Sequence, residues 1–383
     1  KTTEDSDNLS TASWKPQLEQ DGEYAVYVSY QSFPNSCTKA HYEVRHNGGT
    51  TTFEVNQKMC GGTWIYLGTF GFSSGADNQG VTLTNQGARG GIVSADAVRF
   101  GGGMGNIARS PAKEDEDGKP IDIGFDVEPE TSSYPRFCEA ARYNLQWAGM
   151  VDTIYSKFKG CNDYTDDIAA RGRWVNAMAS GSSRIPEAKG GYNIPLDLSM
   201  ALHTDAGITA NDSVVGTLAI FTLSGDDQSE IFKYGGERWI SRELTDIIQS
   251  QVVDDIRATY EPQWVRRSLW DRNYGESRVP EVPSMLLELL SHQNLADMRY
   301  GLDPSFKFTV SRSIYKGILK FISFVSGENY VVQPLPIEDF ASTLDNNGNV
   351  TLTWSSREDP LEKSALAEGY VVYTRICDLD KAG

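Results

Sequence analysis

An apolar run late in the chain most constrains how the chain can fold. The run covers residues 282–287 (Val-Pro-Ser-Met-Leu-Leu), and Glu288 follows it directly. A continuous apolar run of this length is typical of a buried strand. A carboxylate at the end of such a strand must be solvated, paired with a cation or used chemically, because leaving it buried and unpaired is costly. Glu288 is therefore the first candidate for a functional residue.

A second apolar run, residues 199–202, ends in His203, and Thr204 and Asp205 follow. A single histidine after an apolar strand is usually a hydrogen-bonded structural residue. A His and a Glu at the ends of two buried strands instead indicate a metal-assisted hydrolase. In open α/β sheets, sites gather at the carboxyl ends of strands, and both residues fit that position.

The composition divides the chain into four parts. Residues 1–104 hold short strand patterns between turn residues, which is typical of an antiparallel β-sandwich. Residues 105–132 include a charged, proline-containing run and are expected to be a linker. Residues 133–325 alternate helical patterns with buried strands, which predicts an α/β domain with a mostly parallel sheet flanked by helices. Residues 326–383 carry a second series of short strands, too few for a whole sandwich of roughly 100 residues.

The individual elements follow from the same patterns. The strands expected in the first part are residues 24–30, 41–46, 51–55, 64–67 and 80–83. The α/β part is expected to have strands at 196–202, 216–223 and 282–287 and helices at 139–150 and 238–260. The tail is expected to have strands at 330–336, 349–354 and 370–373.

Charge and hydropathy narrow the function classes. The net charge of −17 disfavours nucleic-acid binding, since a phosphate backbone needs a basic face. No continuous apolar stretch approaches the roughly 18 residues of a membrane span, so no span is expected. The polar start has neither an initiator Met nor a signal peptide, which indicates a processed or excised start. A neutral sugar or peptide substrate remains compatible with this charge.

The cysteines leave two interpretations open. Cys37 and Cys60 fall in one expected domain, Cys138 and Cys161 in the next, and Cys377 is left over. None forms a CxxC pair, which disfavours a zinc knuckle or a thioredoxin motif. Local disulfides in an exported protein would explain the grouping, and buried free thiols would explain it equally well.

Several polar residues of the α/β part stand in a specific order. Glu139 lies where a helix begins, Arg171 and Asn176 precede the strand of His203, and an Asn and an Asp follow Glu288 at positions 294 and 297. This order, over residues 133–325, resembles the zinc-dependent N-acetylmuramoyl-L-alanine amidases of the bacterial cell wall. The resemblance implies that Glu139 and His203 bind zinc and that Glu288 is the catalytic acid-base residue.

The resemblance also implies a mechanism, amide hydrolysis. Zinc would polarise the scissile carbonyl and acidify water, and Glu288 would take the proton of that water and return it to the leaving amine. Arg171 would assist by pairing with a carboxylate of the site or of the substrate.

One ligand of the amidase pattern has no counterpart in this sequence. The family has a further zinc histidine in a His-Gly motif ahead of its glutamate, whereas His41 and His46 lie in the expected sandwich and His292 follows Glu288. A catalytic zinc takes three protein ligands and an open position. We expect the third ligand upstream of Lys1, the alternative being a degenerate site.

The flanking parts resemble known modules. Residues 14–104 contain Tyr-Ala-Val-Tyr-Val at 24–28, His-Asn-Gly-Gly at 46–49 and Ala-Asp-Ala-Val-Arg-Phe at 95–100. They resemble the golvesin C-terminal-like sandwich, which accompanies secreted Bacteroidetes proteins often labelled "xanthan lyase". The tail resembles the start of a fibronectin type III domain. These resemblances imply a secreted, periplasmic or cell-surface protein that acts on a cell-wall glycopeptide or polysaccharide.

Structural roles compete with the catalytic ones. Glu139 is equally well a solvated acid favoured in the first turn of a helix, and Arg171 is equally well a residue that supports a helix. Asp205 fits an outer-shell partner of a metal site or a turn. For the whole chain, the rivals of an amidase are a polysaccharide lyase and a non-catalytic glycan-binding or surface protein with a degenerate hydrolase domain.

Overall fold

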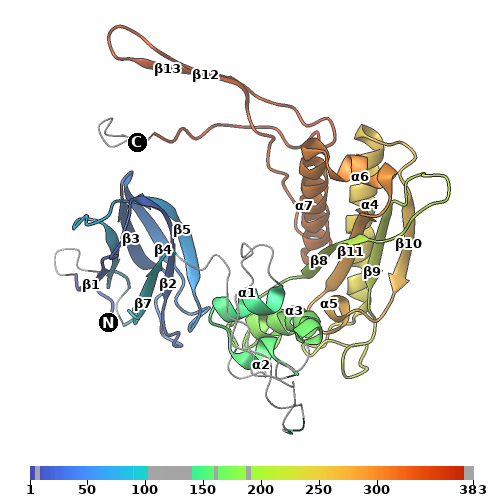
Figure 1. The fold of residues 1–383 in the computed structure, drawn as a ribbon, viewed down its shortest axis with the longest axis horizontal. Helices are drawn as coiled ribbons and strands as arrows, with labels where there is room; N and C mark the ends of the chain where they lie inside the picture. The colour runs from blue at the N-terminus through green and yellow to red at the C-terminus, as the bar shows by residue number, and fades with distance from the viewer. Residues whose placement is uncertain are drawn as a thin grey trace, which may run out of the picture. The chain divides into compact units, whose positions relative to one another are not determined.

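The computed structural model describes residues 1–4, 9–88, 90–101, 117, 119, 140–158, 163–186 and 191–374. The chain forms two compact units (Figure 1). The first comprises Lys1–Leu196 with Val279–Glu281 and the chain end from Thr374, and the second comprises Asp197–Arg278 and Val282–Tyr373. The sequence-based domain limits at residues 104, 132 and 325 stay predictions.

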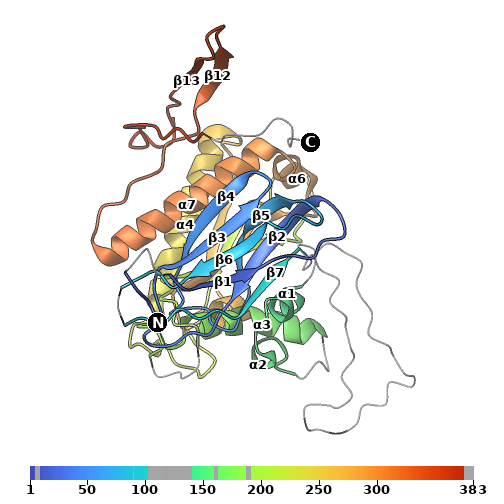
Figure 2. The ribbon, with the colours of Figure 1, turned by 90° about the vertical axis from the view of Figure 1, so that its left-hand side faces the viewer.

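Antiparallel strands build the first part of unit 1, coloured blue to cyan in Figure 2. They are β1 (Thr11–Trp14), β2 (Gly22–Ser29), β3 (Ala40–His46), β4 (Gly49–Val55), β5 (Ile65–Phe72), β6 (Gly80–Thr84) and β7 (Ala97–Phe100). One sheet has the order β1-β6-β3-β4 and the other β5-β2-β7. The five strands expected in this part are confirmed, and β1 and β7 are additional.

The core of this sandwich follows the two-residue period of its strands. Along β3, Ala40, Tyr42 and Val44 are buried and alternate with more exposed residues. They pack with buried residues of the other sheet, among them Val26 and Phe72. Such alternation is what a sheet with one covered face requires, which explains why these strands could be predicted.

The two cysteines that lie in described residues of the sandwich are free thiols. Cys37 and Cys60 are both partly buried and form no disulfide. Burial raises the pKa of the Cys60 thiol. Cys138, Cys161 and Cys377 lie outside the described residues.

Three helices complete the described part of unit 1: α1 (Ala141–Trp147), α2 (Asp152–Tyr155) and α3 (Asp163–Ala179). α1 attaches to the sandwich through aromatic residues. The Trp147 ring lies 4.8 Å from the Tyr27 ring, and the Arg99 guanidinium lies 4.2 Å from the centroid of Trp64 and 4.8 Å from that of Trp147. The backbone N–H of Trp64 also donates to the backbone carbonyl of Ala148 at 3.0 Å. The sandwich and α1 therefore share one aromatic cluster.

Unit 2 is built on a mixed sheet with the order β10-β9-β11-β8. Its strands are β8 (Ser199–Asp205), β9 (Thr217–Phe221), β10 (Arg266–Asp271) and β11 (Ser284–Ser291). The pairs β10–β9 and β11–β8 are parallel and β9–β11 is antiparallel. The strands expected at 196–202, 216–223 and 282–287 correspond to β8, β9 and β11, and the sequence does not predict β10.

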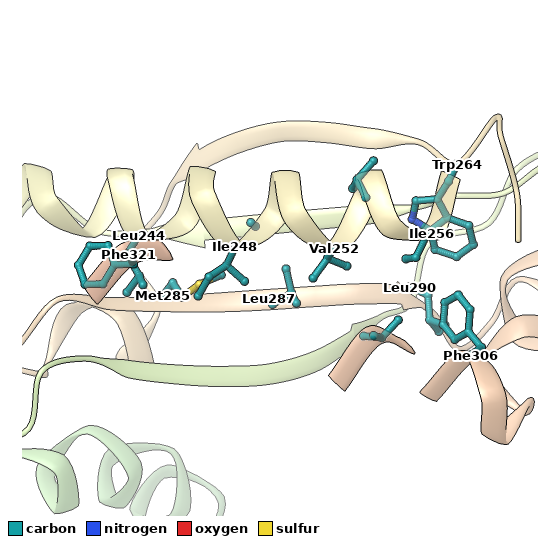
Figure 3. Packing of buried hydrophobic residues seen from close by; sticks show 13 residues of the cluster. Leu244, Ile248, Val252, Ile256, Trp264, Met285, Leu287, Leu290, Phe306 and Phe321 are labelled. Carbon is teal, nitrogen blue, oxygen red and sulfur yellow. The ribbon is translucent and has the colours of Figure 1, made fainter. Parts of the chain in front are cut away.

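Two long helices, α4 (Trp239–Thr259) and α7 (Pro304–Ser326), pack side by side on this sheet (Figure 1). α4 confirms the helix expected at 238–260. Figure 3 shows Ile248 and Val252 of α4 against Met285 and Leu287 of β11, all of them fully buried. Burial of side chains this large contributes roughly 1.5–3 kcal/mol each, so this layer is the main core of the unit.

The opposite face of the sheet is apolar over a smaller area. Leu218 and Ile220 of β9 and Leu286 of β11 are buried there, with Ala201 of β8 packed against them. Two short helices complete the unit, α5 (Gly275–Arg278) and α6 (Leu295–Gly301). Within the described residues no helix combines the length and apolar character of a membrane span.

The described part of the tail after α7 contains one hairpin, formed by the antiparallel strands β12 (Glu338–Leu344) and β13 (Val350–Ser355). β13 confirms the strand expected at 349–354. The strands expected at 330–336 and 370–373 are wrong, because both segments are without regular structure. Apolar character alone does not make a strand when no neighbouring strand supplies hydrogen bonds. The fibronectin type III resemblance stays a prediction.

Candidate hydrolase site

The parallel pairing of β11 with β8 places Glu288 directly beside His203. Side chains of paired residues point to the same face of a sheet. Glu288 and His203 share the face of Leu286 and Ala201, which is opposite to the face covered by α4 and α7. The expectation that both residues end their strands is wrong in detail, because β8 continues to Asp205 and β11 to Ser291.

A β-bulge follows Glu288 in β11. Glu288 pairs with His203 but Ser291 pairs with Asp205, so β11 has one residue more than β8 over this interval. A bulge of this kind changes the face to which the following residues point. Leu290 accordingly packs in the core of the helix-covered face, although it lies two residues after Glu288. The bulge leaves Glu288 as the last β11 side chain on the site face before the register changes.

Helix α5 brings a second acid to His203. The Nε2 atom of His203 lies 2.9 Å from Oε1 of Glu276. The side chain of Glu276 is 11% exposed and that of His203 is 32% exposed. Sequence reasoning missed Glu276, because a single turn of helix between two strands has no periodicity to mark it. The only signal is an acid in the short segment before the strand of Glu288.

The carboxylate of Glu288 is partly desolvated. Its Oε2 atom is buried and has no hydrogen-bond partner among the described residues. Burial raises the pKa of Glu288, the charges of His203 and Arg267 act to lower it, and those of Asp205 and Glu276 raise it further. A carboxyl group whose pKa is raised in this way accepts protons more readily than an exposed glutamate.

An ion pair lies next to these residues. Arg267 of β10 binds the carboxylate of Asp205, which also accepts the N–H of Ala206 at 2.7 Å. Burial acts to raise the pKa of Asp205, but the hydrogen bonds from Arg267 and Ala206 outweigh it, and the pKa is lowered. Asp205 is therefore held as an anion. Arg267, a second residue that sequence reasoning missed, supplies a fixed positive charge to the site face.

The other predicted site residues belong to unit 1 or lie outside the described part. Arg171 of α3 pairs with Asp167 one turn earlier, at 2.7 Å. The Asn176 side chain donates to the Val279 carbonyl at 2.9 Å and accepts the Glu281 N–H at 2.8 Å. Glu139 lies outside the described residues. The catalytic role of Arg171 and the metal role of Glu139 stay predictions.

Asn294 and Asp297, the two predicted residues that follow Glu288 in the sequence, have structural roles. Asp297 is fully buried and accepts the N–H groups of Ser291 and Val215, both at 2.8 Å, and that of Gly216 at 3.3 Å. Asn294 caps α6 by accepting the Asp297 N–H at 3.0 Å. They tie the end of β11 to the loop that enters β9, and so they fix the strand that carries Glu288.

Glycine is required at one position of that loop. Gly216 has φ +79°, and a Cβ there would lie 2.2 Å from the Val265 carbonyl oxygen. A larger residue would push β9 away from the segment that leads into β10.

The metal-binding capacity of the site can be judged from its donor atoms. His203 offers an imidazole nitrogen, a donor type that zinc takes in hydrolases, and Glu276 offers a carboxylate of the kind that a zinc-binding histidine commonly contacts. Within the ranges that the structure describes, no group of three or more His, Cys, Asp or Glu side chains is placed to hold one ion. The described residues thus fit part of a zinc site, and Glu139 is not among them.

Comparison with known proteins identifies the N-terminal part. Residues 1–102 match the Golvesin C-terminal domain, which confirms the golvesin-like resemblance. A curated relative, the xanthan lyase of Bacillus sp. (strain GL1), is 35% identical over 92 residues, which are 24% of this chain and 10% of the relative. The solved Paenibacillus xanthan lyase is 36% identical over 24% of this chain and 8% of its own, with a TM-score of 0.22. The chain therefore spans about a tenth of the length of these relatives.

Structures of N-acetylmuramoyl-L-alanine amidases are also similar. AmiC2 of Nostoc punctiforme has 16% identity and a TM-score of 0.26, and the match covers 33% of this chain and 58% of AmiC2. The amidase from Clostridium difficile 630 has 17% identity and a TM-score of 0.29, and the match covers 47% of this chain and 82% of the amidase.

Proposed function

We propose that this chain carries a zinc-dependent amide hydrolase of the N-acetylmuramoyl-L-alanine amidase type, acting on cell-wall peptidoglycan or a related glycopeptide. The observation that carries the proposal is the placement of Glu288. A partly desolvated carboxylate, with one oxygen buried and without a hydrogen-bond partner among the described residues, lies beside His203 on the sheet face that also holds Leu286 and Ala201. Such a group costs stability, and a role in proton transfer explains why the fold keeps it there.

Glu288 acts as the general base and then as the general acid. Its carboxylate takes a proton from water as the water oxygen bonds to the carbonyl carbon, and it delivers that proton to the nitrogen when the C–N bond breaks. The raised pKa of Glu288 favours uptake of the proton that the residue later donates.

His203 and Glu139 are the proposed zinc ligands. A zinc ion bound by them supplies the positive charge that polarises the carbonyl and acidifies water. Arg171 is proposed to pair with a carboxylate of the site or of the substrate. The proposed location is outside the cytoplasm (secreted, periplasmic or cell surface), where peptidoglycan is found.

A second candidate function is a polysaccharide lyase, because the relative with 35% identity over 92 residues is a xanthan lyase. A lyase removes a proton next to a uronic carboxylate, which needs a base and a neutralising cation. Glu288 and Arg267, whose charges interact, would supply these two groups. The region shared with that relative is 10% of its length. We prefer the amidase proposal because it uses Glu288 and His203, which lie side by side in this structure.

The test compares the wild type with Glu288→Gln, using the exposed Glu230→Gln as the matched control. Zinc is measured by elemental analysis and hydrolysis by release of peptide from purified peptidoglycan. With all three proteins made full-length, the expected result is zinc near one per chain in each, with hydrolysis reduced about 10²–10⁴-fold only in Glu288→Gln. Full activity in Glu288→Gln would remove the base role.

Two other outcomes replace the amidase proposal. An unsaturated product that absorbs in the ultraviolet, formed without zinc, identifies a lyase. Retained glycan binding without zinc or turnover identifies a non-catalytic protein.

A further inference from the structure

His203 contacts one of the two glutamates near it and not the other. Its Nε2 atom lies 2.9 Å from Glu276, whereas Oε2 of Glu288, its partner in the sheet register, has no hydrogen-bond partner among the described residues. Two acids of the same type therefore have different relations to one imidazole.

Helix α5, which carries Glu276, is itself firmly attached to the sheet. Ser277 is fully buried, and its hydroxyl lies 2.7 Å from the Thr222 hydroxyl just after β9. The Ser284 hydroxyl at the start of β11 donates to the Ser277 carbonyl at 3.0 Å. Glu276 thus extends from a support fixed to both neighbouring strands, which is how a residue that orients another is usually built.

The contact determines which ring nitrogen carries the proton. A glutamate carboxylate only accepts hydrogen bonds, so a neutral imidazole bonded to it through Nε2 must hold its proton on Nε2. The lone pair of the ring then lies on Nδ1. Histidines that bind metals commonly donate their other N–H to a carboxylate, which fixes the tautomer and makes the nitrogen a better ligand.

We propose that Glu276 is a positioning residue that fixes His203 as the Nε2–H tautomer and leaves Nδ1 as the nitrogen that binds zinc. This inference rests on the proposed function for its zinc ion, but the tautomer can be measured without zinc. In this proposal Glu276 acts by orienting His203, and Glu288 transfers the proton.

The first experiment determines the tautomer in the zinc-free protein. The chain has four histidines, so a long-range ¹H–¹⁵N spectrum of protein labelled at histidine resolves each ring, and the spectrum of His203→Gln assigns one set of signals. We expect His203 to be the Nε2–H tautomer in the wild type and in Glu230→Gln, and a mixture of tautomers in Glu276→Ala. An Nδ1–H tautomer in the wild type, or an unchanged spectrum in Glu276→Ala, overturns the proposal.

The second experiment measures zinc affinity by calorimetry in the same variants, with cobalt as a spectroscopic probe. Loss of an outer carboxylate typically weakens metal binding 10–100-fold, and we expect this range for Glu276→Gln while the tetrahedral cobalt spectrum persists. Binding as tight as in the wild type overturns the positioning role and leaves the proposed function intact. Abolished binding and a changed cobalt spectrum identify Glu276 as a direct ligand and also overturn it.

Absence of zinc binding in the wild type, with the Nε2–H tautomer present, has a different meaning. It removes the proposed zinc-dependent function and with it the metal part of the inference, while the hydrogen bond itself stands. The two experiments together therefore separate a failed inference from a failed function.

Discussion

The two faces of the sheet in unit 2 are built from the same strands but under different rules. Toward α4 and α7, β11 presents Met285 and Leu287, which pack in a cluster of buried apolar residues. Toward the other side it presents Leu286 and then Glu288, beside His203 and near the Asp205–Arg267 pair. The difference teaches that the helix-covered face provides the stability that allows the other face to hold charges at a cost.

The largest expected loss of stability concerns a buried charge in the helices that cover the sheet. Lys316 of α7 lies 2.7 Å from the Asp255 carboxylate of α4, and the two side chains are 1% and 7% exposed. Removing one partner of a buried pair costs about 3–5 kcal/mol, because the other charge stays buried. Lys316→Met should lower the free energy of unfolding by this amount in denaturant titrations. The double variant Lys316→Met/Asp255→Leu should recover most of it, and a double variant as unstable as the single one would contradict this account.

The next prediction compares the loss of stability at two leucines that pair with each other in neighbouring strands. Leu287 of β11 and Leu202 of β8 are register partners, but Leu287 is fully buried and Leu202 is 59% exposed. Leu287→Ala should cost about 3 kcal/mol, because a buried leucine replaced by alanine leaves a cavity. Leu202→Ala should cost less than about 0.5 kcal/mol, as exposed positions do. Equal losses in thermal unfolding would mean that burial under the helices does not make the difference between the two positions.

A buried phenol extends the comparison to the sandwich. Burial raises the pKa of Tyr42 to about 12 from 10.0, although the hydrogen bond from Gln57 acts to lower it. Because the folded-state pKa is above the unfolded one, the stabilisation is complete below pH 10 and is lost as the pH rises to about 12. The loss should be roughly 3 kcal/mol, at 1.4 kcal/mol per pH unit. Unfolding followed by near-ultraviolet circular dichroism should show a smaller alkaline loss in Tyr42→Phe, and the same loss in both proteins would exclude Tyr42 as the cause.

The smallest expected effect is a gain in the free energy of unfolding. Glu288→Met removes a carboxylate from the site face and keeps a side chain of similar size. We expect the free energy of unfolding of the chelator-treated protein to rise by about 1 kcal/mol, since replacing a poorly partnered buried charge is often stabilising. Glu230→Met, at an exposed position, should change it little. A clear loss of stability in Glu288→Met would show that the carboxylate is held by partners and is not a cost.

The sequence predicts the parts of the fold that depend on local patterns. The apolar run before Glu288 predicts β11, and alternation around Tyr42 predicts β3. β10 contains two arginines and an aspartate and lies at the sheet edge, so its composition does not mark a strand. The strands expected at 330–336 and 370–373 were wrong because pairing partners decide whether an apolar segment becomes a strand.

The candidate site could be predicted only in part for a similar reason. Glu288 and His203 are marked by the apolar runs before them. Glu276 is 73 residues from His203, and only the attachment of α5 to the sheet brings them together. Arg171 illustrates the opposite problem, since a sequence pattern cannot distinguish an arginine for a substrate from one that pairs with Asp167 along its own helix.

The aromatic cluster between the sandwich and α1 bears on how the N-terminal region could be moved between proteins. The family match ends at residue 102, yet Tyr27 and Arg99 inside it contact Trp147 outside it. A fragment ending at residue 102 would expose these rings to water and lose the Arg99–Trp147 contact. The region that matches the family model therefore ends before the region that packs together. Grafting the sandwich onto another protein requires either α1 or a new partner for Tyr27.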